Sequence, residues 1–400
     1  MGFSKSLWDV TIEENILVVC KTPMAKSITK RTLAGFRNTR VNAQYYKNLI
    51  ENISERPEAV VNTFRDGKHF WKINENSSMK LDAIVGNPPY QVMDGGAGAS
   101  ATPIYNKFVG LAKKLKGSYI SMITPSRWFA GGKGLDAYRD EMINDNRISK
   151  IVNFANGKDC FPTASTGSIS YFLWDKNYCG DCCFKSILNG QEDICVRPLN
   201  EFEILISNNK AISIIHKVLS LGETSFSDIV RPYKPFGLRS YVRGRSSKKQ
   251  NDVILYSSDG TSFIDRGEIT ACQDIIDKYK IMTSKLLAEH AGEPDKSGRY
   301  RVLSRTEIIS INTACTESYL VLGAFDSIDV AKHCYKYCCS RFFRFLLLQF
   351  MSSINMTKEV FRFVPLQDFT KPWTDEELYK KYNLTDEEIQ FIESMIKPME

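Results

Sequence analysis

The chain has 400 residues, a hydrophobic fraction of 43%, a charged fraction of 25% and a formal net charge of +7 at pH 7. These values are ordinary for a soluble globular protein of two or three domains, and the modest positive charge suits an acidic partner. No apolar run reaches the roughly 20 residues of a membrane span. Acidic residues stand where a signal peptide would be apolar, so we expect neither secretion nor a membrane partner. Eleven cysteines in such a chain predict free thiols in a reducing compartment, and we expect a cytoplasmic protein.

The first 80 residues have no clear assignment. Residues 15–20 (NILVVC) have the composition of a strand, and residues 25–55 are mostly helical in pattern. The second segment is basic, with Lys26, Lys30, Arg31, Arg37 and Arg40.

From residue 81 onward, strand and helix patterns alternate. Strands are predicted at 81–85, 118–124, 148–154 and 168–174, and helices at 104–115 and 135–143. This alternation predicts a doubly wound α/β sheet, with 81–85 as a buried strand. A further strand at 183–188 is expected to form an antiparallel hairpin with 168–174 at the edge of the sheet.

The regular alternation ends near residue 225, which indicates a change of domain. We predict an unassigned segment at 1–80, a catalytic α/β domain at 81–225, an α+β recognition domain at 226–365 and a helical tail at 366–400. Two capping boxes, Thr374…Glu377 and Thr385…Glu388, each predict the beginning of a short helix in the tail.

The strand at 81–85 is followed by Gly86 and then by Asn87-Pro88-Pro89-Tyr90. Ligands of open α/β sheets bind at the carboxyl ends of strands, where these residues are expected. An aromatic amine such as that of adenine becomes more nucleophilic when both of its hydrogens are hydrogen-bonded. The side-chain oxygen of Asn87 and the main-chain carbonyl of Pro88 are suitable acceptors. Pro89 fixes the turn, and Tyr90 offers a ring on which a flipped base can stack. The alternative is a rigid strand-to-loop turn without a catalytic role.

These residues resemble the catalytic motif of adenine-specific DNA methyltransferases of restriction–modification systems. Residues 119–132 (YISMITPSRWFAGG) resemble the strand and loop that follow the motif in that family, and residues 160–176 (CFPTASTGSISYFLWDK) resemble a later loop and strand. The C-terminal region beginning FVPLQDF resembles the tail of the large methylases of the family. The resemblance implies a Rossmann-like methyltransferase sheet and methyl transfer from S-adenosylmethionine to N6 of adenine in double-stranded DNA. It also implies that Phe161 stacks on the other face of the flipped base.

The cofactor loop of the family, a glycine-rich turn after an early strand, has no counterpart before residue 81. Residues 21–25 (KTPMA) contain no glycine. The glycine-rich segment 95–100 follows the motif, and we expect it to be a mobile loop over the base or the DNA backbone. The methyltransferase sheet is therefore expected to be incomplete in its N-terminal half, and the cofactor-binding residues stay unassigned. A partner subunit is expected to carry the cofactor-binding half or a nuclease.

The densest basic stretch is 231–249 (RPYKPFGLRSYVRGRSSKK), at the beginning of the second domain. Its seven basic residues are Arg231, Lys234, Arg239, Arg243, Arg245, Lys248 and Lys249, and it contains no acidic residue. Such a stretch suits phosphate contacts, and in the resembling family the recognition of the target sequence is placed here. We expect it to bind DNA, although a solvated surface loop would have the same composition.

Two alternatives to a complete enzyme remain. One is a DNA-specificity subunit with an incomplete catalytic domain, which needs a partner to supply the cofactor site. The other, a methyltransferase acting on RNA or on protein glutamine, is disfavoured by the long C-terminal recognition region. Cys179 and Cys182 have the spacing of a zinc pair but lack a matching second pair, so we expect no metal.

Overall fold

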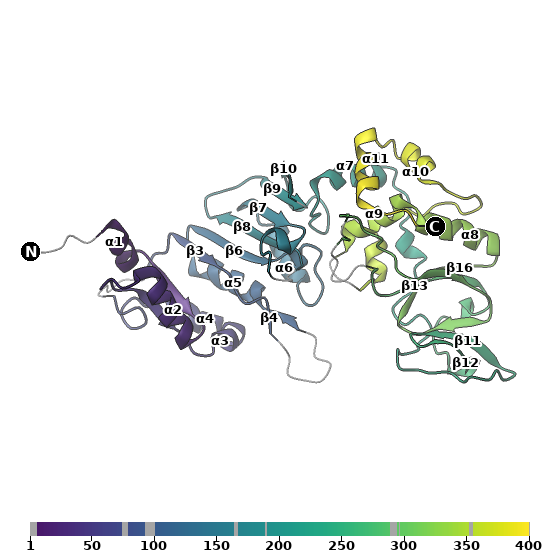
Figure 1. The fold of residues 1–400 in the computed structure, drawn as a ribbon, viewed down its shortest axis with the longest axis horizontal. Helices are drawn as coiled ribbons and strands as arrows, with labels where there is room; N and C mark the ends of the chain where they lie inside the picture. Colours follow the sequence, from purple (N-terminus) through teal and green to yellow (C-terminus); the bar gives the residue numbers. More distant parts are fainter. Residues whose placement is uncertain are drawn as a thin grey trace, which may run out of the picture.

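The structure is a computed structural model that describes residues 6–73, 79–92, 101–163, 167–188, 190–288, 294–295, 297–351 and 355–399. The molecule is elongated in Figure 1, with the N-terminal helices at one end and strands β11 (Asp252–Ser257) and β12 (Gly260–Asp265) toward the other. A six-stranded sheet lies between them. Among the described helices, none is both long enough and apolar enough to cross a membrane.

The N-terminal part is a small α/β unit. Its elements are α1 (Leu7–Glu14), β1 (Leu17–Cys20), α2 (Pro23–Ala34), β2 (Asn42–Tyr45), α3 (Leu49–Glu55) and α4 (Pro57–Arg65). Strands β1 and β2 pair in parallel, which confirms the strand predicted at 15–20. The side chain of Thr22 accepts a hydrogen bond from the amide of Ala25, and Pro23 occupies the first turn, so helix α2 begins at this point.

The central sheet is mixed, and its strand order is β10-β9-β7-β8-β6-β3. Its strands are β3 (Ala83–Gly86), β6 (Tyr119–Pro125), β7 (Ile148–Phe154), β8 (Ile169–Asp175), β9 (Cys182–Leu188) and β10 (Gln191–Arg197), and its main helices are α5 (Tyr105–Leu115) and α6 (Asp136–Ile143). The pairs β3–β6 and β7–β9 are parallel, and the other three pairs are antiparallel. The predicted α/β class is therefore confirmed.

The predicted hairpin between 168–174 and 183–188 is wrong. Strand β8 lies between β6 and β7 and pairs with both, so neither of its edges is free for β9. Strand β9 instead pairs in parallel with β7 and forms a hairpin with β10. The turn of that hairpin contains Gly190, whose φ of +75° favours glycine.

The prediction that residues 81–85 form a buried strand is also wrong. Among the described residues, β3 pairs only with β6, so it is an edge strand of the sheet. The side chain of Ile84 packs into the core, whereas Val85 is 76% exposed. An apolar run predicts a strand, but only a neighbour on each side and a cover on each face would bury it.

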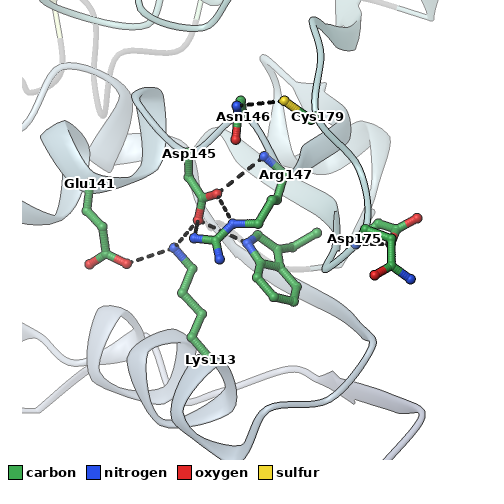
Figure 2. A network of polar contacts seen from close by, with 9 residues as sticks. Lys113, Glu141, Asp145, Asn146, Arg147, Asp175 and Cys179 are labelled. Carbon is green, nitrogen blue, oxygen red and sulfur yellow. Dashed lines mark hydrogen bonds and ion pairs between the residues drawn. The ribbon is translucent and has the colours of Figure 1, made fainter.

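An ion-pair network ties α5 to the segment between α6 and β7 (Figure 2). The carboxylate of Asp145, 4% exposed, accepts hydrogen bonds from Lys113 Nζ at 2.9 Å, Arg147 Nε at 2.7 Å and Trp174 Nε1 at 2.9 Å. Burial raises the pKa of Asp145, but the hydrogen bonds from Arg147 and Lys113 outweigh it and bring the pKa to about 2. The network therefore joins α5 to α6 and to the segment that leads into β7.

The C-terminal half contains two three-stranded sheets, β12-β11-β15 and β14-β13-β16. The remaining elements are α7 (Asn209–Leu219), β13 (Tyr279–Ser284), β14 (Thr306–Ile309), β15 (Thr313–Cys315), β16 (Tyr319–Phe325), α8 (Ile328–Cys339), α9 (Arg341–Phe350), α10 (Asp375–Lys381) and α11 (Asp386–Met395). Both predicted capping boxes are confirmed at the first residues of α10 and α11. The largest core cluster extends from Ile204 to Ile396, so the predicted boundaries at 225 and 365 lie within one shared core and stay predictions.

Candidate active site at the end of strand β3

The Asn-Pro-Pro-Tyr motif follows directly after the carboxyl end of β3. Asn87 is exposed, Pro88 is buried, and Pro89 and Tyr90 are half-buried. Among the described residues, the side chain of Asn87 has no hydrogen-bond partner, and its amide oxygen is free to accept a hydrogen bond from a ligand. The motif therefore has a rigid, buried base and a free amide at its tip.

The end of the motif is fixed to the beginning of helix α5. The main-chain carbonyl of Tyr90 accepts a hydrogen bond of 3.2 Å from the amide of Ile104. The short strands β4 (Gln91–Val92) and β5 (Thr102–Pro103) pair in an antiparallel manner just beyond it. The glycine-rich segment 95–100, predicted to be a closing loop, lies outside the described residues.

A second segment lies close to Tyr90. Burial raises the pKa of Tyr90, and the nearby Cys160 raises it further, so Cys160 is within electrostatic reach of the phenol. Cys160 directly precedes Phe161, whose amide donates a hydrogen bond of 2.8 Å to the carbonyl of Gly157. Phe161 is half-buried. The segment containing Phe161 therefore includes a residue, Cys160, that is close enough to Tyr90 to influence its pKa.

A cavity of about 180 Å³ with a mixed polar and apolar lining, which the sequence did not reveal, lies at the carboxyl ends of β6 and β7. The buried amide oxygen of Asn153 accepts a hydrogen bond of 2.6 Å from Ser126 Oγ. In the described structure, Asn153 Nδ2 and Arg127 Nε are buried without a partner. The polar Asn153, next to the apolar pair Ile151 and Val152 near the end of β7, was the signal that could have indicated this cavity.

The basic stretch 231–249 is largely neutralised by carboxylates. The ion pairs are Arg231–Asp274 at 3.5 Å, Arg239–Glu317 at 3.5 Å, Arg243–Asp259 at 2.5 Å and Arg245–Asp252. Of the seven predicted DNA-binding residues, Lys234, Lys248 and Lys249 have side-chain ammonium groups without a carboxylate partner in the described part of the chain, although the main-chain amide of Lys249 donates to Asp252 at 2.8 Å. The charge that is free to meet a phosphate is therefore smaller than the sequence indicates.

The N-terminal unit does not provide a glycine-rich cofactor turn. Strand β1 ends at Cys20, and helix α2 begins only three residues later at Pro23. Strand β2 ends at Tyr45, and Tyr46 and Lys47 follow where the resembling family has an acidic residue. These described residues do not fit S-adenosylmethionine, because they offer neither close backbone approach nor a carboxylate for its ribose.

Comparison with known proteins agrees with the motif. Residues 14–161 match the model of the Eco57I restriction-modification methylase family. The matched segment contains the N-terminal unit from β1 to α4, the motif at Asn87–Tyr90 and Phe161.

One curated relative is an uncharacterized adenine-specific methylase of Mycoplasma pneumoniae, which is 32% identical over 158 residues. The alignment covers 38% of this chain and 36% of that relative's length.

The solved structures that are similar to this chain superpose on it only loosely. A nuclease-deletion mutant of the Type ISP restriction-modification enzyme LlaGI, in complex with a DNA substrate mimic, has a TM-score of 0.46 and 8% identity, covering 87% of this chain and 40% of that chain. A modification subunit of a type I restriction enzyme from Vibrio vulnificus has a TM-score of 0.32 and 12% identity, covering 66% and 49% of the two chains. These scores are too low to support an argument, and the sequence match carries the assignment. The resemblance is confirmed: residues 14–161, with Asn87–Tyr90 among them, match the Eco57I restriction-modification methylase family.

Proposed function

We propose that this chain forms the catalytic and target-recognition part of a site-specific DNA methyltransferase of a restriction–modification system. The proposed reaction is methyl transfer to the exocyclic N6 amine of adenine. The observation that carries the proposal is the free amide of Asn87 on a rigid turn at the carboxyl end of β3, within the segment that matches the methylase family.

The proposed chemistry needs two acceptors and no covalent nucleophile. The N6 lone pair of adenine is delocalised into the ring, which makes the amine a weak nucleophile. Hydrogen bonds from N6 to Asn87 Oδ1 and to the Pro88 carbonyl would localise this lone pair. Pro89 restricts the rotation of the turn, so the Pro88 carbonyl keeps its direction. The motif would in this way prepare the amine before the methyl group arrives.

The base must leave the duplex to reach this turn. Tyr90 is proposed to stack on one face of the flipped adenine, and Phe161 on the other. The influence of Cys160 on the pKa of Tyr90 supports this pairing, because Phe161 is the next residue along the chain.

The methyl donor is proposed to be S-adenosylmethionine, which supplies an electrophilic methyl group when bound. Because the described residues do not fit it, we propose that a partner polypeptide brings the cofactor-binding half. Among the described residues one edge of β3 has no partner strand, which supports this proposal, since a parallel strand of the partner could pair with it by β-strand addition. The exposed Val85 would be covered in the completed sheet.

A second candidate function is a DNA-specificity subunit whose catalytic motif is inactive. The open edge of β3 and the missing glycine-rich turn favour this alternative. The two candidates differ in one respect, which is whether Asn87 takes part in methyl transfer.

Methyl transfer by the native assembly tests the proposal. The tagged chain is isolated from the organism that encodes it, with its bound proteins, and incubated with tritiated S-adenosylmethionine and unmethylated plasmid DNA. We expect label in N6-methyladenine with the natural chain and none with Asn87→Ala. The control variant Asn177→Ala, at an exposed turn of the same sheet, should label normally. Equal labelling by Asn87→Ala would instead support the specificity subunit.

A further inference from the structure

A second basic surface lies at the opposite end of the molecule from β11 and β12 (Figure 1). Helix α2, strand β2 and the segment at Trp71–Lys72 enclose a groove of about 710 Å³. Its six basic lining residues are Lys26, Lys30, Arg31, Arg37, Arg40 and Lys72. Among the described residues that line the groove, none is acidic.

The local sequence makes this surface strongly positive. Residues 15–48 contain seven lysines and arginines and no aspartate or glutamate, and five of the seven line the groove. A concentration of like charge on one concave surface creates a potential that attracts phosphates. Nothing in the proposed catalytic chemistry uses these residues.

Few of these cations are neutralised by carboxylates. Arg37 Nε pairs with Asp9 at 2.8 Å, and Lys26 Nζ donates to the neutral amide of Gln44 at 2.9 Å. Within the described ranges, Lys30, Arg31 and Lys72 have no carboxylate partner. The contrast with stretch 231–249, where every arginine is ion-paired, makes this groove the larger source of available positive charge.

Two further features point to a nucleic acid and not to a simple anion. Asn42 lines the groove and is 2% exposed, and its Oδ1 has no hydrogen-bond partner in the described structure. This oxygen is suited to an N–H donor, which a phosphodiester lacks but the exocyclic amine of a base can supply. Beside the groove, Phe36 is 93% exposed, and the guanidinium of Arg31 lies 4.7 Å from its ring centre. An exposed ring next to phosphate-binding cations can stack on a base.

We propose that the α2–β2 groove binds the phosphate backbone of the DNA substrate. This inference rests on the proposed function for the identity of the ligand. The substrate would then be held at both ends of the elongated chain, with strand β3, which leads into the motif, between the two contacts (Figure 1).

Salt-dependent binding of a fluorescent duplex to the purified full chain tests this inference. The slope of log K against log salt is measured by anisotropy for the natural chain, for Lys30→Ala with Arg31→Ala, and for Lys47→Ala with Lys68→Ala. The first pair lies in the groove and breaks no ion pair with a described carboxylate. The second pair removes the same charge from exposed lysines of the same region outside the groove. Circular dichroism checks that all three proteins are folded.

We expect the groove variant to lose about two units of slope, since each lost phosphate contact removes about 0.9. The control variant should keep the slope of the natural chain. An unchanged slope in the groove variant, or an equal loss in both variants, would overturn the proposal. Calorimetry with inorganic pyrophosphate completes the experiment. If the groove variant lost pyrophosphate binding but kept the salt slope for DNA, the groove would be a site for small anions, and this result would also overturn the proposal. Because the readout is DNA binding, it is independent of whether Asn87→Ala affects methylation.

Discussion

Val19 of β1 and Ile84 of β3 pack against the same hydrophobic cluster, although their strands do not pair with each other. The cluster is formed by α3, α4 and α5, and it includes the buried residues Val60 and Phe64. The two-stranded and six-stranded sheets therefore share one layer of helices, while one edge of β3 has no partner strand in the described ranges. This relationship is the physical basis for proposing that a strand from a partner completes the sheet.

Substitution of Val85 by Asp should prevent the partner from binding without unfolding the chain. Val85 is exposed, so we expect the free energy of unfolding to change by no more than about 0.5 kcal/mol. An added strand would have to cover the new carboxylate, so the partner should be lost from the tagged chain isolated from its organism. The measurement is mass spectrometry of the proteins that copurify.

Val196→Asp is the matched control for this experiment. Val196 is 65% exposed on β10, at the opposite edge of the same sheet. The control should retain the partner. Retention by Val85→Asp, or loss from both variants, would contradict strand addition at β3.

The helices and most strands of the central sheet are predictable from the sequence because their signals are local. The apolar spacing of 104–115 gives α5, and the alternation in 118–124 gives β6. The neighbours of a strand are not a local property. The order that places β8 between β6 and β7 depends on contacts between distant segments, and so does the exposure of β3.

In the candidate site, too, some features follow from the local sequence and others depend on contacts between distant segments. The motif at Asn87–Tyr90 is recognisable because its residue types and its position after a strand suffice. The ion pairing of Arg239 with Glu317, 78 residues away, cannot be read from the basic stretch itself. The groove at α2 was visible only as a basic helical segment, because Lys72 and Trp71 reach it from outside that segment.

Substitution of Asp145 by Asn should destabilise the chain by about 3 kcal/mol at pH 7, because it leaves Lys113 and Arg147 without their shared carboxylate. The pKa of about 2 lies below the usual value of 3.8. The contribution is therefore complete above the usual pKa and is lost as pH falls from about 4 to about 2. Urea unfolding of both proteins at pH 7 and pH 3 measures the difference.

The exposed ion pair of Asp140 with Arg139 provides the control for the Asp145 network. Asp140→Asn should cost no more than about 1 kcal/mol at pH 7. The difference in unfolding free energy between Asp145→Asn and the natural chain should be smaller at pH 3 than at pH 7. An equal difference at both pH values would mean that the carboxylate charge does not cause the destabilisation.

Stacking by Tyr90 can be separated from its hydroxyl group by two substitutions. Tyr90→Phe keeps the ring and should retain methyl transfer within a few-fold. Tyr90→Ala removes a stacking contact of about 1–3 kcal/mol, so kcat/KM should fall by roughly 5- to 150-fold. The measurement is the rate of tritium transfer to DNA by the native assembly. Equal rates for the two variants would contradict the stacking role.

Within stretch 231–249, the lysines that form no ion pair with a described residue should contribute more to DNA binding than the arginines that do. Lys248→Ala with Lys249→Ala should lower the salt slope by about two units without affecting folding. Arg245→Ala should instead lower stability, because Asp252 is fully buried and would lose its partner. Anisotropy and thermal unfolding distinguish the two effects. A stable Arg245→Ala protein with a reduced slope would show that Arg245 contacts phosphate directly.

The central claim is that Asn87 activates the N6 amine of adenine, and single-molecule sequencing of genomic DNA tests it most directly. The codon for Asn87 is changed to alanine on the chromosome of the organism that encodes the chain, and Asn177→Ala serves as the control strain. The account predicts that N6-methyladenine disappears from one recognition sequence in the Asn87→Ala strain and persists there in the control strain. An identical pattern of N6-methyladenine in both strains would contradict the account.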